Sequence, residues 1–373
     1  MKRTVVTITG IRPDFIRMVN IFRLLDENFN HVLIHTGQHY DELLSGSFFA
    51  DLNIRKPDYT LAAGTQSSNH FEQLAYLSVE VPKLLQSQQI APDIILFLGD
   101  SNGVGAAFPL KKAGYRIGHI EAGMRSSDKR MLEEINRTVC DHCSDVYFVY
   151  HDDYRAHLVR ENLWDNIFVV GNTIVEPCLQ YLETSRLMCT PKRNDMILLD
   201  IHRPENFNYP DRLRKLIQFC ERCRERYGVP IKLLYFKRLK DSLLKHDISL
   251  QSIEMIELLP YCKYLELAYH CKFVISDSGT AGEELPLLNT AVIVPRDYTE
   301  RPQSYASSCS IPLFLEEGCS PIAECDGTEQ SAFDFIDNGQ HRRDTGWLYP
   351  PDHQVSSKPT SVRVIEGLRE VLK

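Results

Sequence analysis

The segment HIEAGMRSSDKRMLEEINR, residues 119–137, contains three glutamates that could serve acid or base chemistry. Glu121 directly follows an apolar run and precedes Ala-Gly, so we expect a buried carboxylate with a raised pKa, for which Arg125 is a candidate partner. Glu133 and Glu134 begin a helical pattern, where the helix dipole stabilises acidic side chains whether or not they do chemistry. Local evidence therefore favours Glu121 as a catalytic residue and the dipole as the reason for the pair.

Polar side chains also follow other apolar runs of the first half. Asp100 in FLGDSNG is a candidate catalytic residue, with helix N-capping as the alternative. Arg12 in ITGIRPDFIR stands in a turn that could approach a phosphate, and a surface turn with one exposed arginine explains it equally well. Gln38 and His39 belong to the polar cluster HTGQHYDE, for which a solvated loop is the alternative. All of these residues stand at the end of a predicted strand.

The second half offers two further strand ends. IHRPENF places His202 beside Arg203, a pair suited to acid or base chemistry or to phosphate binding, with a structural histidine as the alternative. In VISDSGTAGEELP, hydroxyls and backbone N–H groups could cradle a pyrophosphate where a helix opens, and they belong to Ser278, Gly279 and Thr280. Glu284, one turn further, could accept hydrogen bonds from ribose hydroxyls. This stretch favours a nucleoside diphosphate site over a helix cap.

Short β-rich runs precede these residues and alternate with helical patterns. In the first half the predicted strands span residues 4–10, 31–37, 93–100, 116–123, 145–151 and 166–172. In the second half they span residues 196–202, 231–236, 252–260, 273–279 and 291–297. The alternation predicts the α/β class, with two Rossmann-like doubly wound domains that each hold a parallel sheet between helices. Ligands of such sheets bind outside the carboxyl ends of the strands.

The length of 373 residues exceeds what one hydrophobic core usually supports, which also predicts two domains. We expect an N-terminal domain over 1–175, a C-terminal, nucleotide-binding domain over 176–360, and a helix over 361–373 that could cross back to the first domain. Residues 318–359 show no clear pattern and are expected to be irregular.

Composition narrows the functional class. Lys and Arg total 42 against 50 for Asp and Glu, a formal net charge of -8, so no global positive field favours nucleic acid or an anionic membrane. The start, MKRTVVTITG, is β-branched and reads as a buried first strand rather than as a signal peptide. No run approaches the roughly 18 apolar residues of a membrane span. These features predict a cytoplasmic protein.

Eleven cysteines, an odd number without secretory features, predict reduced thiols. Two pairs have CxxC spacing, Cys140 with Cys143 and Cys220 with Cys223, so a zinc site built from both is conceivable. However, both pairs lie on helical patterns, where this spacing only places two residues on one face. Buried helical cysteines are the favoured interpretation, and we expect no metal.

Nine motifs occur in the order and spacing of one enzyme family: GIRPDFIR, TGQHYDE, GDSNG, HIEAGMRS, EEINR, VVGNT, HRPEN, SDSGTAGEE and RDYTERP. Over residues 4–303 the chain resembles the non-hydrolysing UDP-N-acetylglucosamine 2-epimerase family. The resemblance implies the glycosyltransferase-B type of fold, with the active site in the cleft between the two domains. It also implies a homodimer and a cytoplasmic role in supplying an activated sugar for polysaccharide biosynthesis.

The activity implied by the resemblance is an isomerase reaction that inverts C2 of a UDP-2-acetamido sugar. UDP is eliminated to give a 2-acetamidoglucal and is then added back, with the proton delivered to the opposite face of C2. This chemistry needs acids, bases and charge stabilisation, and it uses no cofactor and no metal. The resemblance assigns catalysis to Asp100, Glu121, Glu133 and His202. The implied substrate contacts are Arg12, Arg17, Gln38, His39, Glu134, Arg137, Asn172, Arg203, Ser278, Gly279, Thr280, Glu284 and Arg301.

The chain departs from the family pattern at a few positions. Phe236 stands where a histidine is common, and Tyr40 and Asp41 stand where enzymes activated by their own substrate tend to have Arg and Gln. We therefore do not expect such activation, and a modified UDP-2-acetamido sugar, in a 6-deoxy or diacetamido-uronic form, is an alternative substrate. The residues are also compatible with a hydrolysing 2-epimerase, with a glycosyltransferase of the same fold and with an inactive nucleotide-sugar-binding protein.

Overall fold

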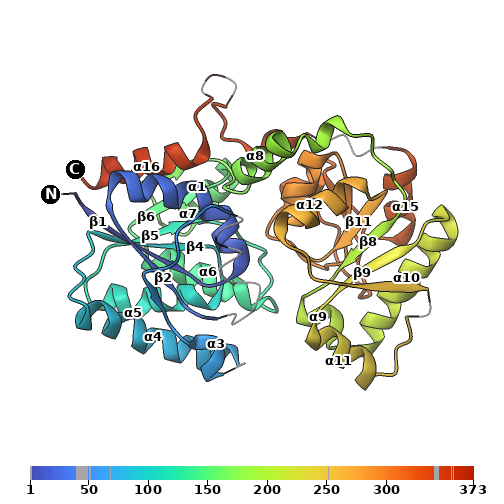
Figure 1. Cartoon of the computed structure of the whole chain (residues 1–373), viewed down its shortest axis with the longest axis horizontal. Helices are drawn as coiled ribbons and strands as arrows, with labels where there is room; N and C mark the ends of the chain where they lie inside the picture. The colour runs from blue at the N-terminus through green and yellow to red at the C-terminus, as the bar shows by residue number, and fades with distance from the viewer. Residues whose placement is uncertain are drawn as a thin grey trace. The chain divides into compact units, whose positions relative to one another are not determined.

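The computed structural model of the chain describes residues 2–38, 49, 52–67, 69–250, 252–339, 344–353, 355 and 357–373. The chain divides into two compact units (Figure 1). The first unit contains residues 1–177 and 348–373, and the second contains residues 178–347. Helix α8, Val175–Ser185, begins in the first unit and ends in the second.

The first unit is built on a parallel sheet with strand order β3-β2-β1-β4-β5-β6-β7. Its strands are β1 (Thr4–Thr9), β2 (Asn30–His35), β3 (Tyr59–Thr60), β4 (Ile94–Leu98), β5 (Ile117–Ile120), β6 (Val146–Val149) and β7 (Ile167–Val169). The central strands are rich in Val and Ile and buried on both faces, as expected for a sheet covered by helices. The order reverses direction between β1 and β4, which creates the crevice where such sheets bind ligands.

The helices of the first unit are α1 (Arg12–Asn28), α3 (Ala63–Gln66), α4 (His70–Ser87), α5 (Ala107–Lys112), α6 (Leu132–Cys143), α7 (Asp152–Arg160) and α16 (Thr360–Val371), with a 3-10 turn η2 (Asn102–Ala106). Pro13 lies in the first turn of α1, where its missing N–H costs little. Asp14 Oδ2 accepts hydrogen bonds from the backbone N–H groups of Gly10 and Ile11, at 3.0 and 3.1 Å. Helix α16, near the C-terminus of the chain, packs beside α1, near the N-terminus of the chain (Figure 1).

The second unit repeats the architecture with strand order β10-β9-β8-β11-β12-β13. Its strands are β8 (Ile197–Asp200), β9 (Ile231–Tyr235), β10 (Ile253–Glu257), β11 (Phe273–Ser276), β12 (Ala291–Val294) and β13 (Ser310–Pro312). Its helices are α9 (Pro204–Phe207), α10 (Pro210–Tyr227), α11 (Lys237–Lys245), α12 (Tyr261–His270), α13 (Ala281–Glu284), α14 (Pro302–Ala306) and α15 (Glu329–Asp337), with 3-10 turns η3 (Leu187–Cys189) and η4 (Leu285–Leu288). The 3-10 turn η5 (Thr345–Leu348) ends at Leu348, where the chain re-enters the first unit. The strand order reverses direction between β8 and β11, which creates a second crevice like that of the first unit.

The prediction of two doubly wound α/β units is confirmed, and every predicted strand is present. The sequence patterns do not predict the short edge strands β3 and β13. The expectation of an irregular stretch over residues 318–359 is wrong at α15. There Thr328 Oγ1 accepts a hydrogen bond from the Ser331 N–H at 3.1 Å, which caps the helix. Phe333 and Phe335 form its buried apolar face. The surrounding Gly and Cys residues obscure this helical pattern in the sequence.

Both CxxC pairs are buried helical cysteines, as the sequence favours. Cys140 and Cys143 lie on α6 in the core of the first unit, and Cys220 and Cys223 lie on α10 in the core of the second. Burial raises the pKa of Cys223 to about 12, so its thiol stays protonated at neutral pH. The two pairs pack into separate cores rather than forming one ligand set.

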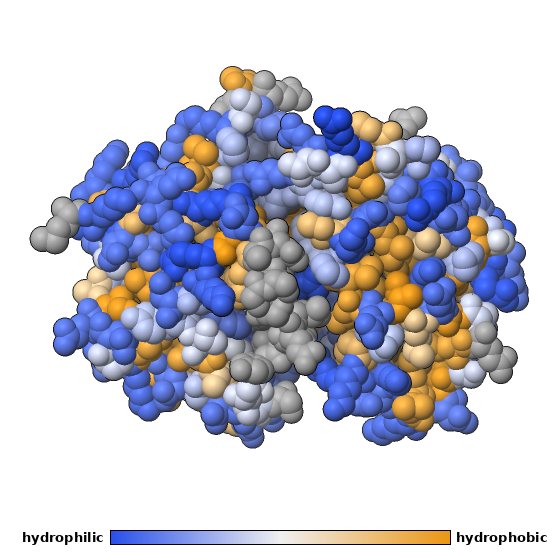
Figure 2. Space-filling view, viewed as in Figure 1, coloured by the Kyte–Doolittle hydropathy of each residue, from blue (hydrophilic) through white to orange (hydrophobic). Residues whose placement is uncertain are grey.

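In the part of the chain that the structure describes, no helix is both long and apolar enough to cross a membrane. Figure 2 shows hydrophilic residues interspersed with hydrophobic ones over the visible face of the first unit.

Candidate active site

The carboxyl ends of three adjoining strands bring the predicted residues of the first unit together. Strand β4 pairs with β1 on one side and with β5 on the other. The turn after β1 carries Arg12, the turn after β4 carries Asp100, and the residue after β5 is Glu121. The reversal of strand order at β1 and β4 thus lies beneath these turns, as expected for a ligand site in this architecture.

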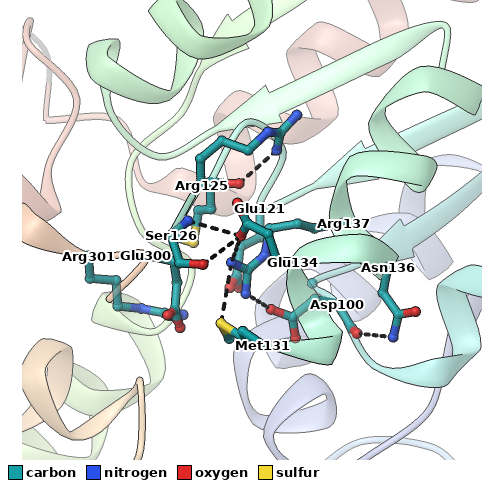
Figure 3. Close-up of polar contacts among 12 residues, drawn as sticks. Asp100, Glu121, Arg125, Ser126, Met131, Glu134, Asn136, Arg137, Glu300 and Arg301 are labelled. Carbon is teal, nitrogen blue, oxygen red and sulfur yellow. Dashed lines mark hydrogen bonds and ion pairs between the residues drawn. The ribbon is translucent and has the colours of Figure 1, made fainter. Parts of the chain in front are cut away.

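Arg137 of α6 links two of the carboxylates. Its side chain is 2% exposed and forms ion pairs with Asp100 and with Glu134, the latter at 2.8 Å (Figure 3). The Asn136 amide also donates a hydrogen bond to the main-chain oxygen of Asp100 at 2.9 Å. The alternative of an N-cap does not describe Asp100, because η2 begins after Ser101 and the Asp100 carboxylate turns to α6 instead.

Glu134 closes the loop that separates it from Glu121. Its carboxylate accepts hydrogen bonds from the Ser126 N–H at 2.9 Å, from Ser126 Oγ at 3.0 Å and from the Ser127 N–H at 2.9 Å (Figure 3). The loop therefore folds back on the first turn of α6. The helix dipole alone is an incomplete account of Glu134, because its oxygens hold the loop and Arg137 in place. Glu133, its half-buried neighbour, lies in the same first turn.

Glu121 occupies a buried and strained position. Its backbone φ is 72°, a left-handed conformation that is unfavourable for a residue with a side chain. The side chains of Glu121 and Arg17 are each 5% exposed and form an ion pair, and the Tyr150 hydroxyl donates to Glu121 Oε2 at 3.3 Å. The expected partner Arg125 is wrong, since that guanidinium binds Asp141 and Glu161. The carboxylate thus faces the cation from α1.

The remaining predicted residues of the first unit come from the turns after β1, β2 and β7. A Cβ on Gly10 would lie 2.7 Å from Ser101 Oγ and 3.1 Å from Gln38 Oε1, so a side chain there would require Ser101 to shift. Gln38 is buried. Asn172 is buried as well, and its Oδ1 accepts a hydrogen bond from the Ile174 N–H at 3.0 Å. Arg12 is half-buried in the first turn of α1. His39, Tyr40 and Asp41 lie outside the described residues.

In the second unit, Asp277 organises the turn that carries His202. The fully buried Asp277 carboxylate accepts hydrogen bonds from the backbone N–H groups of His202 at 3.0 Å and Arg203 at 3.1 Å, and from the Asn206 amide at 2.8 Å. His202 Nδ1 lies 3.1 Å from Asp277 Oδ1, and half of the ring is exposed. The ring is therefore anchored at one nitrogen and accessible to a ligand.

The predicted diphosphate cradle lies on the neighbouring strand of that unit. Ser278 Oγ and Thr280 Oγ1 are 2.7 Å apart, just before the single turn α13 and the 3-10 turn η4. A Cβ on Gly279 would lie 2.7 Å from Arg301 Nη1, so a larger residue at this position would require that guanidinium to shift. Arg301 itself donates to Glu283 Oε1 at 2.6 Å and pairs with Glu300. Glu284 is buried at the end of α13.

Two residues near these sites are absent from the sequence-based set. Tyr150 contacts Glu121, and its hydroxyl is also 2.5 Å from Thr173 Oγ1. Asp277 holds the His202 turn. Both stand directly after a strand, β6 and β11 respectively, which is the same position that identified the other candidates. A search of strand ends for every polar residue would have found them.

Comparisons with known proteins identify the family of the chain. The model of the UDP-N-acetylglucosamine 2-epimerase family matches residues 24–315. The UDP-N-acetylglucosamine 2-epimerase of Methanocaldococcus jannaschii is 34% identical over 82% of this chain and 86% of its own. The enzyme of that name from Methanococcus maripaludis is 35% identical over 80% of this chain and 84% of its own.

A crystal structure of the Methanocaldococcus jannaschii enzyme, in complex with UDP-GlcNAc and UDP, resembles the chain with a TM-score of 0.83. The identity is 29%, and the alignment covers 98% of this chain and 99% of that one. The predicted glycosyltransferase-B type of fold is thereby confirmed. With a family model that spans most of its length and two relatives above 30% identity, the chain belongs to the UDP-N-acetylglucosamine 2-epimerase family.

Proposed function

We propose that the protein is an isomerase that inverts C2 of UDP-N-acetylglucosamine without net hydrolysis. The observation that carries the proposal is the group of carboxylates Asp100, Glu121 and Glu133 at the carboxyl ends of adjoining strands and the start of α6. The relatives from Methanocaldococcus jannaschii and Methanococcus maripaludis are named for this activity, which supports UDP-N-acetylglucosamine as the first substrate to test.

The chemistry asks for two proton transfers and for stabilisation of charge at C1. One carboxylate removes the C2 proton as UDP leaves, and another acid delivers a proton to the opposite face when UDP returns. Negative oxygens near the ring favour the positive charge that develops at C1. Asp100, Glu121, Glu133 and His202 form the proposed catalytic set.

We propose that Ser278, Gly279 and Thr280 of the second unit hold the diphosphate of UDP, and that Glu284 accepts hydrogen bonds from the ribose hydroxyls. Arg12 of the first unit is a further proposed phosphate contact. The support is the short, tightly packed turn before α13 and the burial of Glu284. The remaining proposed contacts are Arg17, Gln38, His39, Glu134, Arg137, Asn172, Arg203 and Arg301.

Incubation with UDP-N-acetylglucosamine in deuterated water tests the proposal. NMR should show deuterium at C2 and an equilibrium mixture of the two C2 epimers, both still joined to UDP. A parallel arm uses 6-deoxy and diacetamido-uronic UDP-2-acetamido sugars, because Phe236 departs from the family pattern. Free N-acetylmannosamine with an equal amount of UDP would instead identify a hydrolysing enzyme. Absence of exchange with every sugar would refute the epimerase proposal.

We also propose that the protein forms a homodimer through helices α4, α5 and α6. Helix α5 contacts both of the others, and α6 exposes three apolar side chains at helical spacing, Leu132, Ile135 and Val139. Phe71 and Val79 of α4 and Phe108 of α5 are exposed as well. Apolar side chains gathered on adjoining helices are typical of a subunit interface.

Light scattering is expected to give twice the chain mass of 42.9 kDa. Ile135→Asp should shift the protein to monomer, because a charge in an apolar interface is left without a partner. Val159→Asp, an exposed position on α7 of the same unit, is the matched control and should remain dimeric. A wild-type monomer, or a dimer that tolerates Ile135→Asp, would exclude this interface.

A further inference from the structure

A buried histidine lies directly beneath the proposed catalytic carboxylates. His119, in β5, is fully buried. Its Nδ1 lies 2.7 Å from Asp141 Oδ1, and its Nε2 lies 2.7 Å from the main-chain oxygen of Gly99. A carboxylate and a carbonyl oxygen can only accept hydrogen bonds, so each ring nitrogen must carry a proton to satisfy both. The geometry therefore requires an imidazolium ion.

The surrounding charges agree with this protonation state. Burial by itself lowers the pKa of His119, but the neighbouring Cys140 and Asp141 of α6 outweigh it and hold that pKa well above the ordinary 6.5. Burial by itself would raise the pKa of Asp141, yet His119 and Arg125 bring it below its ordinary value. The pair is thus an ion pair inside the first unit.

The pair holds both turns that carry catalytic carboxylates. On one side His119 holds the carbonyl of Gly99, the residue before Asp100. On the other side Asp141 Oδ2 accepts hydrogen bonds from the Gly123 N–H at 3.1 Å and from Arg125 Nη1 at 2.7 Å. Gly123 stands two residues after Glu121, whose left-handed backbone persists only where neighbouring contacts fix it.

We infer that His119 and Asp141 are positioning residues for the proposed epimerisation, which keep the turns of Asp100 and Glu121 at the separation that proton transfer requires. The inference rests on the proposed function, because it concerns the same carboxylates. Neither residue needs to touch the substrate. Their effect on the rate acts through the placement of the two acids, to which proton transfer is sensitive at the scale of about 1 Å.

The test compares two buried histidines of the same unit that each bind an aspartate. His119→Gln keeps a polar side chain but can donate at one end only. His31→Gln is the matched control. The buried His31 ring lies 2.6 Å from Asp26 Oδ1 and 2.9 Å from Thr7 Oγ1. His31 stands near the start of β2, at the opposite end of that strand from its carboxyl end. Turnover, C2 exchange, the affinity for UDP and the midpoint of thermal unfolding are measured for both variants.

His119→Gln should lower kcat by about 100-fold while the affinity for UDP stays within about twofold of wild type. His31→Gln should lower the unfolding midpoint but leave kcat within about twofold. Asp141→Asn should resemble His119→Gln, and the double variant should lose little more than either single variant, because the two residues act as one unit. If His119→Gln does not fold, Asp141→Asn is judged by the same criteria.

The inference would be overturned by a His119→Gln enzyme with wild-type kcat, or by losses for His119→Gln and Asp141→Asn that multiply in the double variant. Equal losses of kcat in His119→Gln and His31→Gln would do the same, because they would reflect general loosening of the unit. A wild-type protein without C2 exchange refutes the proposed function instead, so the two failures are distinguishable.

Discussion

Glu121→Gln is expected to lower the rate of C2 exchange by about a thousandfold, the largest effect on catalysis that we predict from any single substitution. Glutamine has nearly the same shape and still accepts a hydrogen bond from Tyr150, so the site keeps its outline. What it loses is the ability to exchange a proton and the negative charge opposite Arg17. The rate is measured by NMR as deuterium incorporation from solvent.

The control for this substitution is Glu176→Gln. Glu176 is a half-buried glutamate of the same unit whose carboxylate accepts hydrogen bonds from the Ser361 N–H and Oγ, at 2.6 and 2.7 Å. It lies in the first turn of α8 and belongs to no proposed catalytic or binding set. Its variant should therefore lose stability but keep its rate of exchange. Wild-type exchange in Glu121→Gln would remove Glu121 from the catalytic set.

The strained backbone of Glu121 supports a catalytic role for its carboxylate. A φ of 72° is readily adopted by glycine, and a glutamate in that conformation destabilises the folded state by an amount on the order of 1 kcal/mol. Retaining such a residue makes sense where the carboxylate performs a function that glycine cannot.

The sequence predicts the positions of the strand ends well, because local patterns determine where strands stop. The residues after β1, β4, β5, β8 and β11 are those that the alternation of strands and helices identifies, and the sheet order brings them to two crevices. The periodicity is a property of neighbouring residues, so it can be read without knowledge of tertiary contacts.

Partnerships between distant residues could not be predicted in this way. Arg125 is close to Glu121 in the sequence but binds Asp141 and Glu161, whereas Arg17, which lies far earlier in the chain on α1, forms the ion pair with Glu121. Which cation meets which carboxylate depends on how α1 and α6 pack on the sheet. Spacing along the chain carries no information about that packing, except within a helix turn such as Glu134 and Arg137.

Arg137→Met is expected to cause the largest loss of stability of any single substitution proposed for this protein. The buried guanidinium neutralises both Asp100 and Glu134, and methionine would leave two carboxylates without their cation. Removing one partner of a buried ion pair costs about 3 to 5 kcal/mol of unfolding free energy. Since Asp100 keeps some solvent access, we expect a value of about 3 kcal/mol. Urea unfolding of the whole protein measures this loss of unfolding free energy. We expect kcat to fall as well.

Two further variants separate the contribution of the ion pairs from that of side-chain volume. Arg137→Lys keeps a positive charge but lacks the planar fork that reaches two carboxylates, so it should recover only part of the stability. Arg130→Met removes an exposed ion pair with Asp128, in which the Arg130 side chain is 57% exposed to solvent. This substitution should change the unfolding free energy by less than about 1 kcal/mol. If Arg137→Met were no more destabilised than Arg130→Met, Asp100 and Glu134 would not depend on Arg137 for their charge balance. The hydrogen bonds from Ser126 and Ser127 would then suffice to hold the Glu134 carboxylate.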